Sequence, residues 1–206
     1  MVKRHLDEVN LDKTSGFIIC HVPNPRYDLY KIYKRVFCID FKHLYNNILI
    51  QMYNHCLIQE EKDMIDRISY LYSIKSDTDS WRRSFNTIFV DFYKRNRNDA
   101  NIVVDYFFSF CKSLLNSNQD NIIYIDTNMI ILKGQNSFDI IESIDELRLP
   151  YEFSVLNYFI IHSKKNYCYV DGYNNIKSKG RMEDRKKMES NIIHHIREDR
   201  LSGILY

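Results

Sequence analysis

The sequence contains little glycine and little proline, with five and three of them among 206 residues. Sandwiches of many short strands and flexible linkers both need more of these residues, so neither class fits. No apolar run approaches the roughly 20 residues that a membrane-spanning helix requires. The first residues, MVKRHLDEVNLDK, lack the apolar stretch of a signal peptide. We therefore expect a cytoplasmic chain with no membrane partner.

Several patterned sites are also missing. The five cysteines are odd in number and scattered, and no CxxC or Cys/His ligand spacing occurs. This predicts reduced, mostly buried thiols rather than a disulfide framework or a zinc site. A Gly-rich phosphate loop, G-x-S-x-G and HExxH are absent from the sequence. The adjacent pair His194–His195 points in two directions on a helix, which favours a solvated face over a metal site.

Apolar and aromatic residues are plentiful instead. Hydrophobic residues make up 45% of the chain, aromatic residues 14% and charged residues 27%. This composition supports one domain with a sizeable core. The net charge is +2, but basic residues gather in 82–83, 94–97, 164–165, 177–181 and 185–187. This clustering is weak support for a phosphate-facing side. Frequent Asn, Ile, Lys and Tyr are typical of AT-rich genes of phages, viruses and plasmids. This composition extends the cytoplasmic expectation to a host cytoplasm or a virus-associated chain.

Hydrophobic periodicity predicts alternating strands and helices. Strands are expected at 16–22, 35–41, 159–162, 167–171 and 176–180, with a hairpin over 122–132. Helices are expected at 42–55, 65–74, 81–93, 101–115, 137–147 and 181–200. This order predicts an α+β fold in which an antiparallel sheet carries helices on one face.

Two acids stand at strand ends in this layout. Asp40 closes an apolar strand before a helix, and Asp126 lies at the tip of the apolar hairpin. Two carboxylates on neighbouring strand ends can converge on Mg²⁺, which proteins hold through one or two carboxylates, waters and substrate phosphates. A pair of such ions stabilises the attacking and leaving oxygens of phosphoryl transfer.

The residues around these acids resemble a known family. The stretch 40–48, DFKHLYNNI, is similar to motif A of family B DNA polymerases, D-x-x-S-L-Y-P-S-I. Residues 82–90, RRSFNTIFV, are similar to motif B, K-x-x-x-N-S-x-Y-G. Residues 124–128, YIDTN, resemble motif C, Y-G-D-T-D. Residues 164–167, KKNY, and 177–180, KSKG, resemble the K-K-R-Y and K-x-x-G elements that follow. A second string, DTDS at 77–80, lacks flanking strands and is interpreted as a capped loop.

The resemblance implies a polymerase palm-like fold and a role for each matching residue. Asp40 and Asp126 would be metal ligands for Mg²⁺ and, with Asn128, would form the catalytic set. Nucleotide binding would fall to Tyr45 beneath the incoming sugar, Arg82 at the triphosphate and Asn86 at the nascent base pair. Nucleic-acid contacts would be made by Lys164, Lys165, Tyr167, Lys177 and Lys179. Residues 1–55 would form the N-terminal part of the palm, 56–118 shortened fingers, and 119–206 the C-terminal palm with a basic helical tail.

The departures from the family pattern bear on activity. Asn128 replaces the second acid of motif C, which is a direct metal ligand in the family, and Val90 replaces the motif B glycine. Motif A has lost the Ser, Pro and Ser of its turn, no exonuclease domain precedes it, and little room remains for a thumb. Losing transition-state charge stabilisation costs several kcal/mol, enough to abolish useful turnover.

Three hypotheses follow from these residues. The first is a non-catalytic palm that binds DNA or another nucleic acid, or scaffolds other subunits, in a viral, phage or plasmid replication or transcription assembly. The second is an active minimal or split polymerase that uses Mg²⁺. The third is an unrelated α+β interaction module, for which Asp40 and Asp126 would lie far apart.

Overall fold

The computed structural model describes residues 10–11, 18–19, 21–22, 31–55, 62–74, 79–134, 137–163 and 166–202. Its helices are α1 (Leu44–Asn54), α2 (Lys62–Ser73), α3 (Asp79–Arg95), α4 (Arg97–Ser117), α5 (Phe138–Asp145) and α6 (Met182–Leu201). Its strands are β1 (Asn10–Leu11), β2 (Ile18–Ile19), β3 (His21–Val22), β4 (Ile32–Phe41), β5 (Ile122–Asp126), β6 (Met129–Lys133), β7 (Tyr151–Ser163), β8 (Asn166–Val170) and β9 (Ile176–Lys179). Every predicted helix is present, and so is the predicted hairpin, as β5 and β6.

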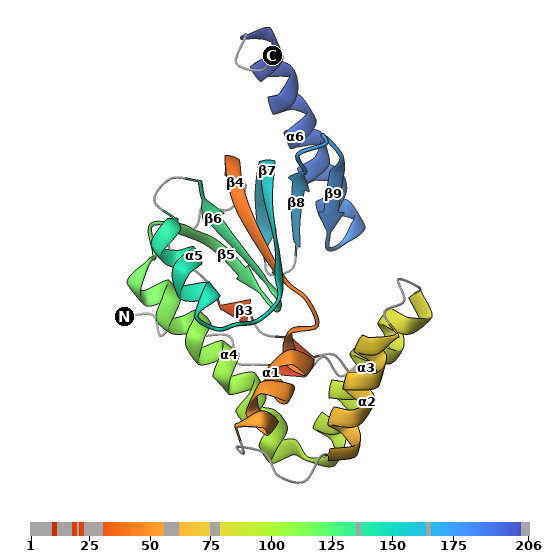
Figure 1. Cartoon of the computed structure of the whole chain (residues 1–206). Coiled ribbons are helices and arrows are strands. Elements are labelled where there is room, and N and C mark those ends of the chain that lie inside the picture. Colours follow the sequence, from red (N-terminus) through yellow and green to blue (C-terminus); the bar gives the residue numbers. More distant parts are fainter. Residues whose placement is uncertain are drawn as a thin grey trace, which may run out of the picture.

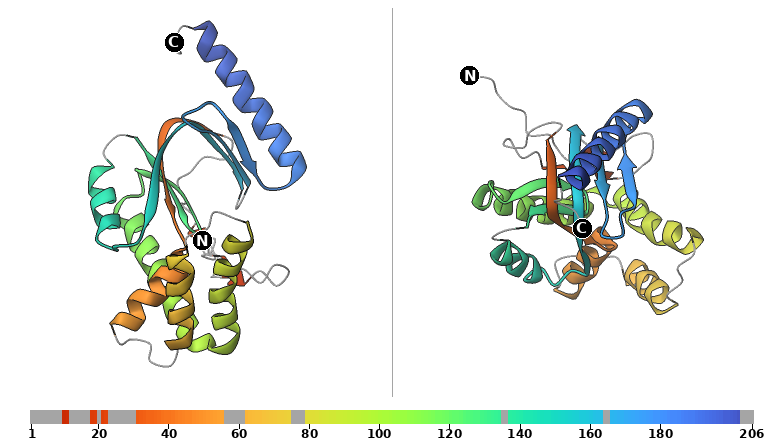
Figure 2. Two further views of the ribbon diagram at one scale, coloured as in Figure 1. Left: turned by 45° about the vertical axis from the view of Figure 1, so that its right-hand side comes forward. Right: turned by 90° about the horizontal axis from the view of Figure 1, so that it is seen from above.

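The described strands form a short β1–β2 ribbon and one larger sheet in the order β3-β5-β6-β4-β7-β8-β9. All neighbouring pairs in the larger sheet are antiparallel. The α+β prediction is therefore confirmed. Figures 1 and 2 show α6 at one end of the molecule and α1, α2 and α3 at the other, with this sheet between them.

Strand β7 is much longer than the sequence predicts. The expected strand covered 159–162, whereas β7 begins at Tyr151 and pairs with β4 from Ile32↔Ile160 to Phe41↔Tyr151. The segment 151–155, YEFSV, does alternate apolar and polar residues as a strand does, so the sequence carried a signal that the prediction did not use. Pairing with the long β4 decides its conformation. The loop expected at 77–80 is wrong at Asp79 and Ser80, which belong to α3, and residues 77–78 lie outside the described residues.

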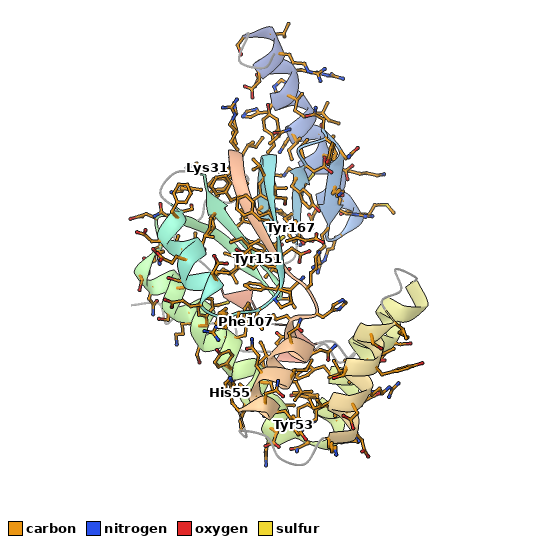
Figure 3. All side chains as sticks on the ribbon, viewed as in Figure 1. Lys31, Tyr53, His55, Phe107, Tyr151 and Tyr167 are labelled. Atoms are coloured by element: carbon orange, nitrogen blue, oxygen red, sulfur yellow. The ribbon has the colours of Figure 1, made fainter. Side chains whose placement is uncertain are left out.

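Helices α1 to α5 share one core with the sheet. The stripe Leu44, Ile48, Leu49 and Met52 of α1 is buried there, at the spacing that predicted the helix. Phe107 of α4 (Figure 3) meets Phe41 of β4 edge to face, with 5.2 Å between ring centroids. Fully buried aromatic contacts of this kind attach the helices firmly to the end of β4.

Helix α6 covers the far part of the same side of the sheet. Met188 and Ile192 pack on β7 and β8 residues such as Ile160 and Cys168. A third cluster, which contains no helix residue, occupies the opposite side: Val36, Cys38, Ile123, Tyr124, Met129, Ile131, Leu156, Phe159, Ile161 and Tyr167. All described helices with buried residues therefore lie on one face, as predicted, and we call the other the open face.

The side-chain alternation of β4 breaks near Arg35. Tyr33 packs with Val36 on the open face although three positions separate them, whereas strict alternation places neighbours two apart on one side. Arg35, between them, has a left-handed backbone with φ 50°. This irregular residue shifts the phase of β4, so Lys34 points towards α6 while Val36 and Cys38 point to the open face.

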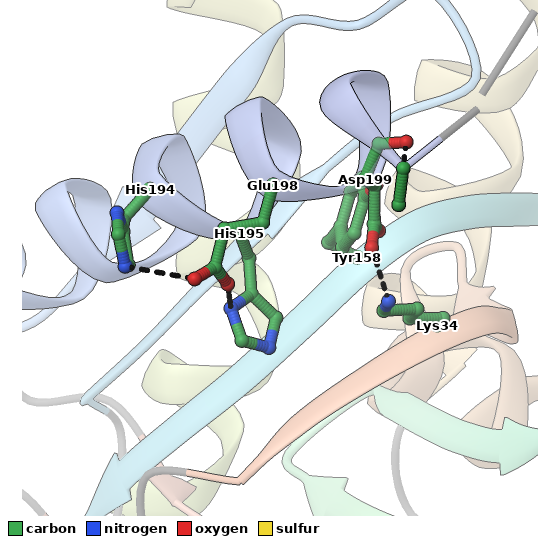
Figure 4. A network of polar contacts seen from close by, with 7 residues as sticks. Lys34, Tyr158, His194, His195, Glu198 and Asp199 are labelled. Atoms are coloured by element: carbon green, nitrogen blue, oxygen red, sulfur yellow. Dashed lines mark hydrogen bonds and ion pairs between the residues drawn. The ribbon is translucent and has the colours of Figure 1, made fainter. Parts of the chain in front are cut away.

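A polar network fixes the end of α6 (Figure 4). Asp199 accepts hydrogen bonds from the Lys34 ammonium at 2.7 Å and from the Tyr158 hydroxyl at 2.7 Å. The lysine and the tyrosine hold the pKa of Asp199 below its ordinary value. His194 and His195 lie on the solvated side of the helix, as predicted, each 3.2 Å from Glu198.

Candidate functional site

The structure brings Asp40, Asp126 and Asn128 to one place on the open face. Asp40 lies near the end of β4 and Asp126 ends β5, and both are paired with Met129 of β6, which lies between them. Their backbones are thus two strand spacings apart, roughly 9–10 Å. Asn128 follows Thr127, whose left-handed backbone (φ 46°) makes the tight turn into β6. All of these except Thr127 line an open hollow of about 840 Å³.

Asn128 is bound to the acid beside it. Its Nδ2 donates to Asp40 Oδ1 at 2.5 Å and to the Phe41 carbonyl at 3.3 Å. Rotating the amide would place its oxygen against these two acceptors, so the nitrogen must face Asp40. The carbonyl oxygen that an asparagine offers to a cation therefore points away from the neighbouring carboxylate. The backbone of Asn128 adds a further link, since its carbonyl accepts from Phe41 N at 2.7 Å.

A lysine holds each carboxylate of the pair. Lys42 Nζ lies 2.8 Å from Asp40 Oδ2 and 2.9 Å from Glu152 Oε2, so it bridges two acids. Burial acts to lower the pKa of Lys42, but the hydrogen bonds to both carboxylates outweigh it and raise that pKa. Lys179 Nζ lies 3.3 Å from Asp126 Oδ2. Asp126 is buried, and Thr127 Oγ1 donates to its other oxygen at 3.2 Å.

Aromatic rings and lysines lie together at the far wall of the hollow, which Tyr167, Tyr169 and Lys177 line and Lys179 adjoins. Lys179 lies 5.6 Å from the centre of the Tyr167 ring (Figure 3), and Lys177 lies 6.0 Å from that of Tyr169. The two tyrosines are stacked, with centroids 6.4 Å apart. Burial raises the pKa of both tyrosine hydroxyls, and the charge of Asp126 raises that of Tyr167 further. They remain neutral hydrogen-bonding groups at any physiological pH.

The predicted nucleotide-binding residues lie on the helical side, at the junction of α1 and α3. Tyr45 stacks on Phe89 of α3 with 5.0 Å between ring centroids, so it packs against the helical core rather than lining the hollow. Arg82 and Asn86 belong to α3, seven and three residues before Phe89, and this spacing puts their positions on the helix face that Phe89 uses. Their side chains lie outside the described residues, as do Lys164 and Lys165.

Sequence reasoning missed several residues at the hollow, among them Glu152, Tyr169 and Asp171, which line it, and Lys42, which contacts Asp40 and Glu152. Glu152 escaped because the first half of β7 was not predicted, although the β4–β7 register sets it opposite Asp40. Tyr169 lies within the predicted strand 167–171 and Asp171 ends it, and neither belongs to a motif-like stretch. Asp171 accepts from the backbone N–H groups of Tyr173 and Asn175, and the Asn175 hydrogen bond is the main cause of its lowered pKa. Lys42 belongs to the motif A-like stretch 40–48, but nothing in the sequence indicated that it contacts Asp40 and Glu152.

These residues do not fit the two-ion arrangement that the family resemblance implies. The third acid position is an amide whose N–H group faces Asp40, and the remaining carboxylates each hold an ammonium group of this chain. A divalent ion needs oxygen ligands in that space, yet nitrogen donors fill it. Within the described residues, no group of three or more His, Cys, Asp or Glu side chains is arranged to hold a metal, and no helix there is long and apolar enough to span a membrane.

Comparisons with known proteins support a distant structural relationship. No protein-family model matches the sequence, and no curated protein matches it significantly. Among solved structures, the chain is similar to the family B DNA polymerase from the hyperthermophilic archaeon Pyrobaculum calidifontis, with a TM-score of 0.50 and 12% sequence identity. The match covers 92% of this chain and 36% of the polymerase chain. At this identity the likeness is one of fold, and it establishes a distant structural relationship between this chain and part of a family B DNA polymerase.

Proposed function

We propose that this chain is a degenerate polymerase-like palm that binds nucleic acid on its open face and does not catalyse nucleotidyl transfer. One observation carries the proposal. Asn128, at the position of the second motif C acid, donates to Asp40, while Lys42 and Lys179 occupy Asp40 and Asp126. The acid pair is thus neutralised by groups of the chain itself.

The energetic argument concerns charge. A two-metal site stabilises the negative charge that develops on the attacking and leaving oxygens, and it does so with carboxylates that hold both ions in place. Replacing a carboxylate by an amide removes one negative charge from that site. Each 1.36 kcal/mol lost from transition-state stabilisation slows the reaction tenfold. A loss of several kcal/mol therefore lowers turnover by a factor on the order of a thousand or more.

Nucleic-acid binding is supported by the other wall of the hollow. Lys177 and Lys179 are about half exposed and lie over the rings of Tyr169 and Tyr167. Ammonium groups next to aromatic faces suit phosphates and stacked bases, without reading sequence. The match to the polymerase spans only part of that protein, so we further propose that other subunits of a replication or transcription assembly complete this chain. Its composition favours a viral, phage or plasmid system.

A primer-extension assay tests the loss of catalysis. The purified chain is incubated with a primed template, nucleoside triphosphates and Mg²⁺ or Mn²⁺, and Asp40→Ala serves as the matched control. We expect no template-dependent extension, together with binding of the same primed template in a gel-shift assay. Extension that disappears in the Asp40→Ala variant would refute the non-catalytic proposal.

The alternative function is an active minimal or split polymerase that uses Mg²⁺ at Asp40 and Asp126. The observation in its favour is that both acids flank Met129 on one face of the sheet. Extension by the wild-type chain, alone or with the remaining polymerase domains added in trans, would establish this alternative. A chain that binds no nucleic acid at all would instead support an unrelated interaction module.

A further inference from the structure

We infer that Lys42 and Lys179 are built-in counter-cations of the acid pair, so that the open face is formed, and takes a nucleic-acid strand, without any divalent ion. The nucleic-acid part of this inference rests on the proposed function. The counter-cation part rests on the contacts alone. The two lysines are positioning residues, because they act on the site by fixing Asp40 and Asp126.

Lys179 reaches Asp126 across the sheet rather than along a loop. Five strand spacings separate β9 from β5 in the strand order, which would be roughly 24 Å in a flat sheet. The Lys179–Asp126 ion pair nevertheless measures 3.3 Å. The sheet is therefore strongly curled, as Figure 2 shows, and Lys179 connects strand β9 at one edge to strand β5 near the other edge.

Aromatic side chains fill the inside of this curl. Tyr124 of β5 lies 5.7 Å from Tyr167 of β8 and 6.0 Å from Phe159 of β7, measured between ring centroids. Lys179 then lies over the outer face of Tyr167, and its backbone is held opposite Tyr167 in the β8–β9 register. The ammonium group is consequently fixed from two directions, by strand pairing and by the ring beneath it.

The Asp126 carboxylate, which Lys179 contacts, is buried away from water and needs a compensating charge. The Asp126 side chain is 1% exposed, and an ionised carboxylate at that depth is costly unless a cation or several hydrogen bonds compensate it. In the described structure its compensation consists of Lys179 and the Thr127 hydroxyl. Where a polymerase places metal ions, the charge balance at Asp126 is completed by a lysine.

The charge of Asp40 is also compensated by a lysine, together with an amide donor. Lys42 bridges it to Glu152, and the Asn128 amide covers its second oxygen. A divalent ion entering between the two acids would have to displace Lys42 from two carboxylates and the Asn128 N–H from a third contact. It would also face two ammonium groups of like charge within a few ångströms of its ligands, which is repulsive.

Metal binding by the full chain tests the inference independently of nucleic acid. Mn²⁺ is titrated into wild type and variants, and binding is followed by electron paramagnetic resonance of the free ion. We expect no site-specific Mn²⁺ binding by wild type, and no change in its unfolding temperature between EDTA and Mn²⁺. The double variant Lys42→Met/Lys179→Met should gain a site for Mn²⁺, with a dissociation constant at least tenfold below the highest Mn²⁺ concentration at which wild type shows no binding. Lys133→Met, at an exposed residue of β6, is the matched control and should leave binding unchanged.

Lys179→Arg is a second variant in case the double methionine variant does not fold. It keeps a positive charge next to Asp126, so it should bind no Mn²⁺. In parallel, the anisotropy of a labelled oligonucleotide is measured in EDTA and in Mg²⁺ at matched ionic strength, and the two dissociation constants should agree. Stoichiometric Mn²⁺ binding by wild type, or nucleic-acid binding that requires Mg²⁺, would overturn the inference. If wild type binds neither Mn²⁺ nor the oligonucleotide, the proposed function fails while the counter-cation role stands.

Discussion

Removing the ammonium group of Lys179 should destabilise the folded chain through the acid that it leaves behind. Lys179→Met keeps most of the aliphatic stem over Tyr167 and deletes only the charge that contacts Asp126. Breaking a fully buried ion pair from one side costs about 3–5 kcal/mol. Because Lys179 is 52% exposed, water partly replaces it, and we expect a smaller loss of about 2 kcal/mol. For a chain of this length that lowers the unfolding temperature by roughly 4–8 °C.

Urea unfolding of a double-mutant cycle measures this loss. Asp126→Asn removes the stranded charge, so the double variant Lys179→Met/Asp126→Asn should be more stable than the sum of the two single losses predicts. Lys177→Met is the matched control. Its partner Asp171 is also bound by backbone N–H groups at Tyr173 and Asn175, so the control should change stability little. Equal losses for the two lysine variants, or strict additivity in the cycle, would refute the reasoning.

Three further perturbations have defined outcomes. Asn128→Asp replaces a hydrogen-bond donor to Asp40 by a second carboxylate, so the unfolding temperature in EDTA should fall. Added Mn²⁺ should restore that temperature, and no effect of Mn²⁺ on this variant would contradict the expectation. The pKa of Asp199 is lowered in the folded state, so its contribution to stability is complete above the ordinary aspartate pKa and is lost as pH falls through the folded-state pKa. Asp199→Asn should therefore flatten the acid limb of the curve of unfolding free energy against pH. An unchanged acid limb would count against the ion pair. Phe107→Ala empties a fully buried position against Phe41 and should cost about 3–5 kcal/mol in urea unfolding, whereas a loss below about 1 kcal/mol would show that the helix–sheet core is not built as described.

The local structure of this chain follows from its sequence. Leu44, Ile48, Leu49 and Met52 recur at the helical period because one side of α1 is buried, and the same physics predicted the other helices. The apolar run on both sides of Asp126 and Asn128 likewise predicted a hairpin, since both of its strands are buried in the sheet. The ordered motif-like stretches led to the family whose fold the structure resembles. All of these signals are short-range, or depend on the order of residues along the chain.

The contacts that define the site depend instead on the tertiary structure. The β4–β7 register sets Glu152 opposite Asp40, and it follows from pairing along both strands, which the local alternation around Glu152 does not specify. Lys179 meets Asp126, 53 residues away in sequence, because the sheet curls around its aromatic filling. The sequence alone determined that an asparagine stands where the family has an acid. Only the fold decided that its amide faces Asp40 and that two lysines complete the charge balance, since these contacts join strands that no local pattern relates.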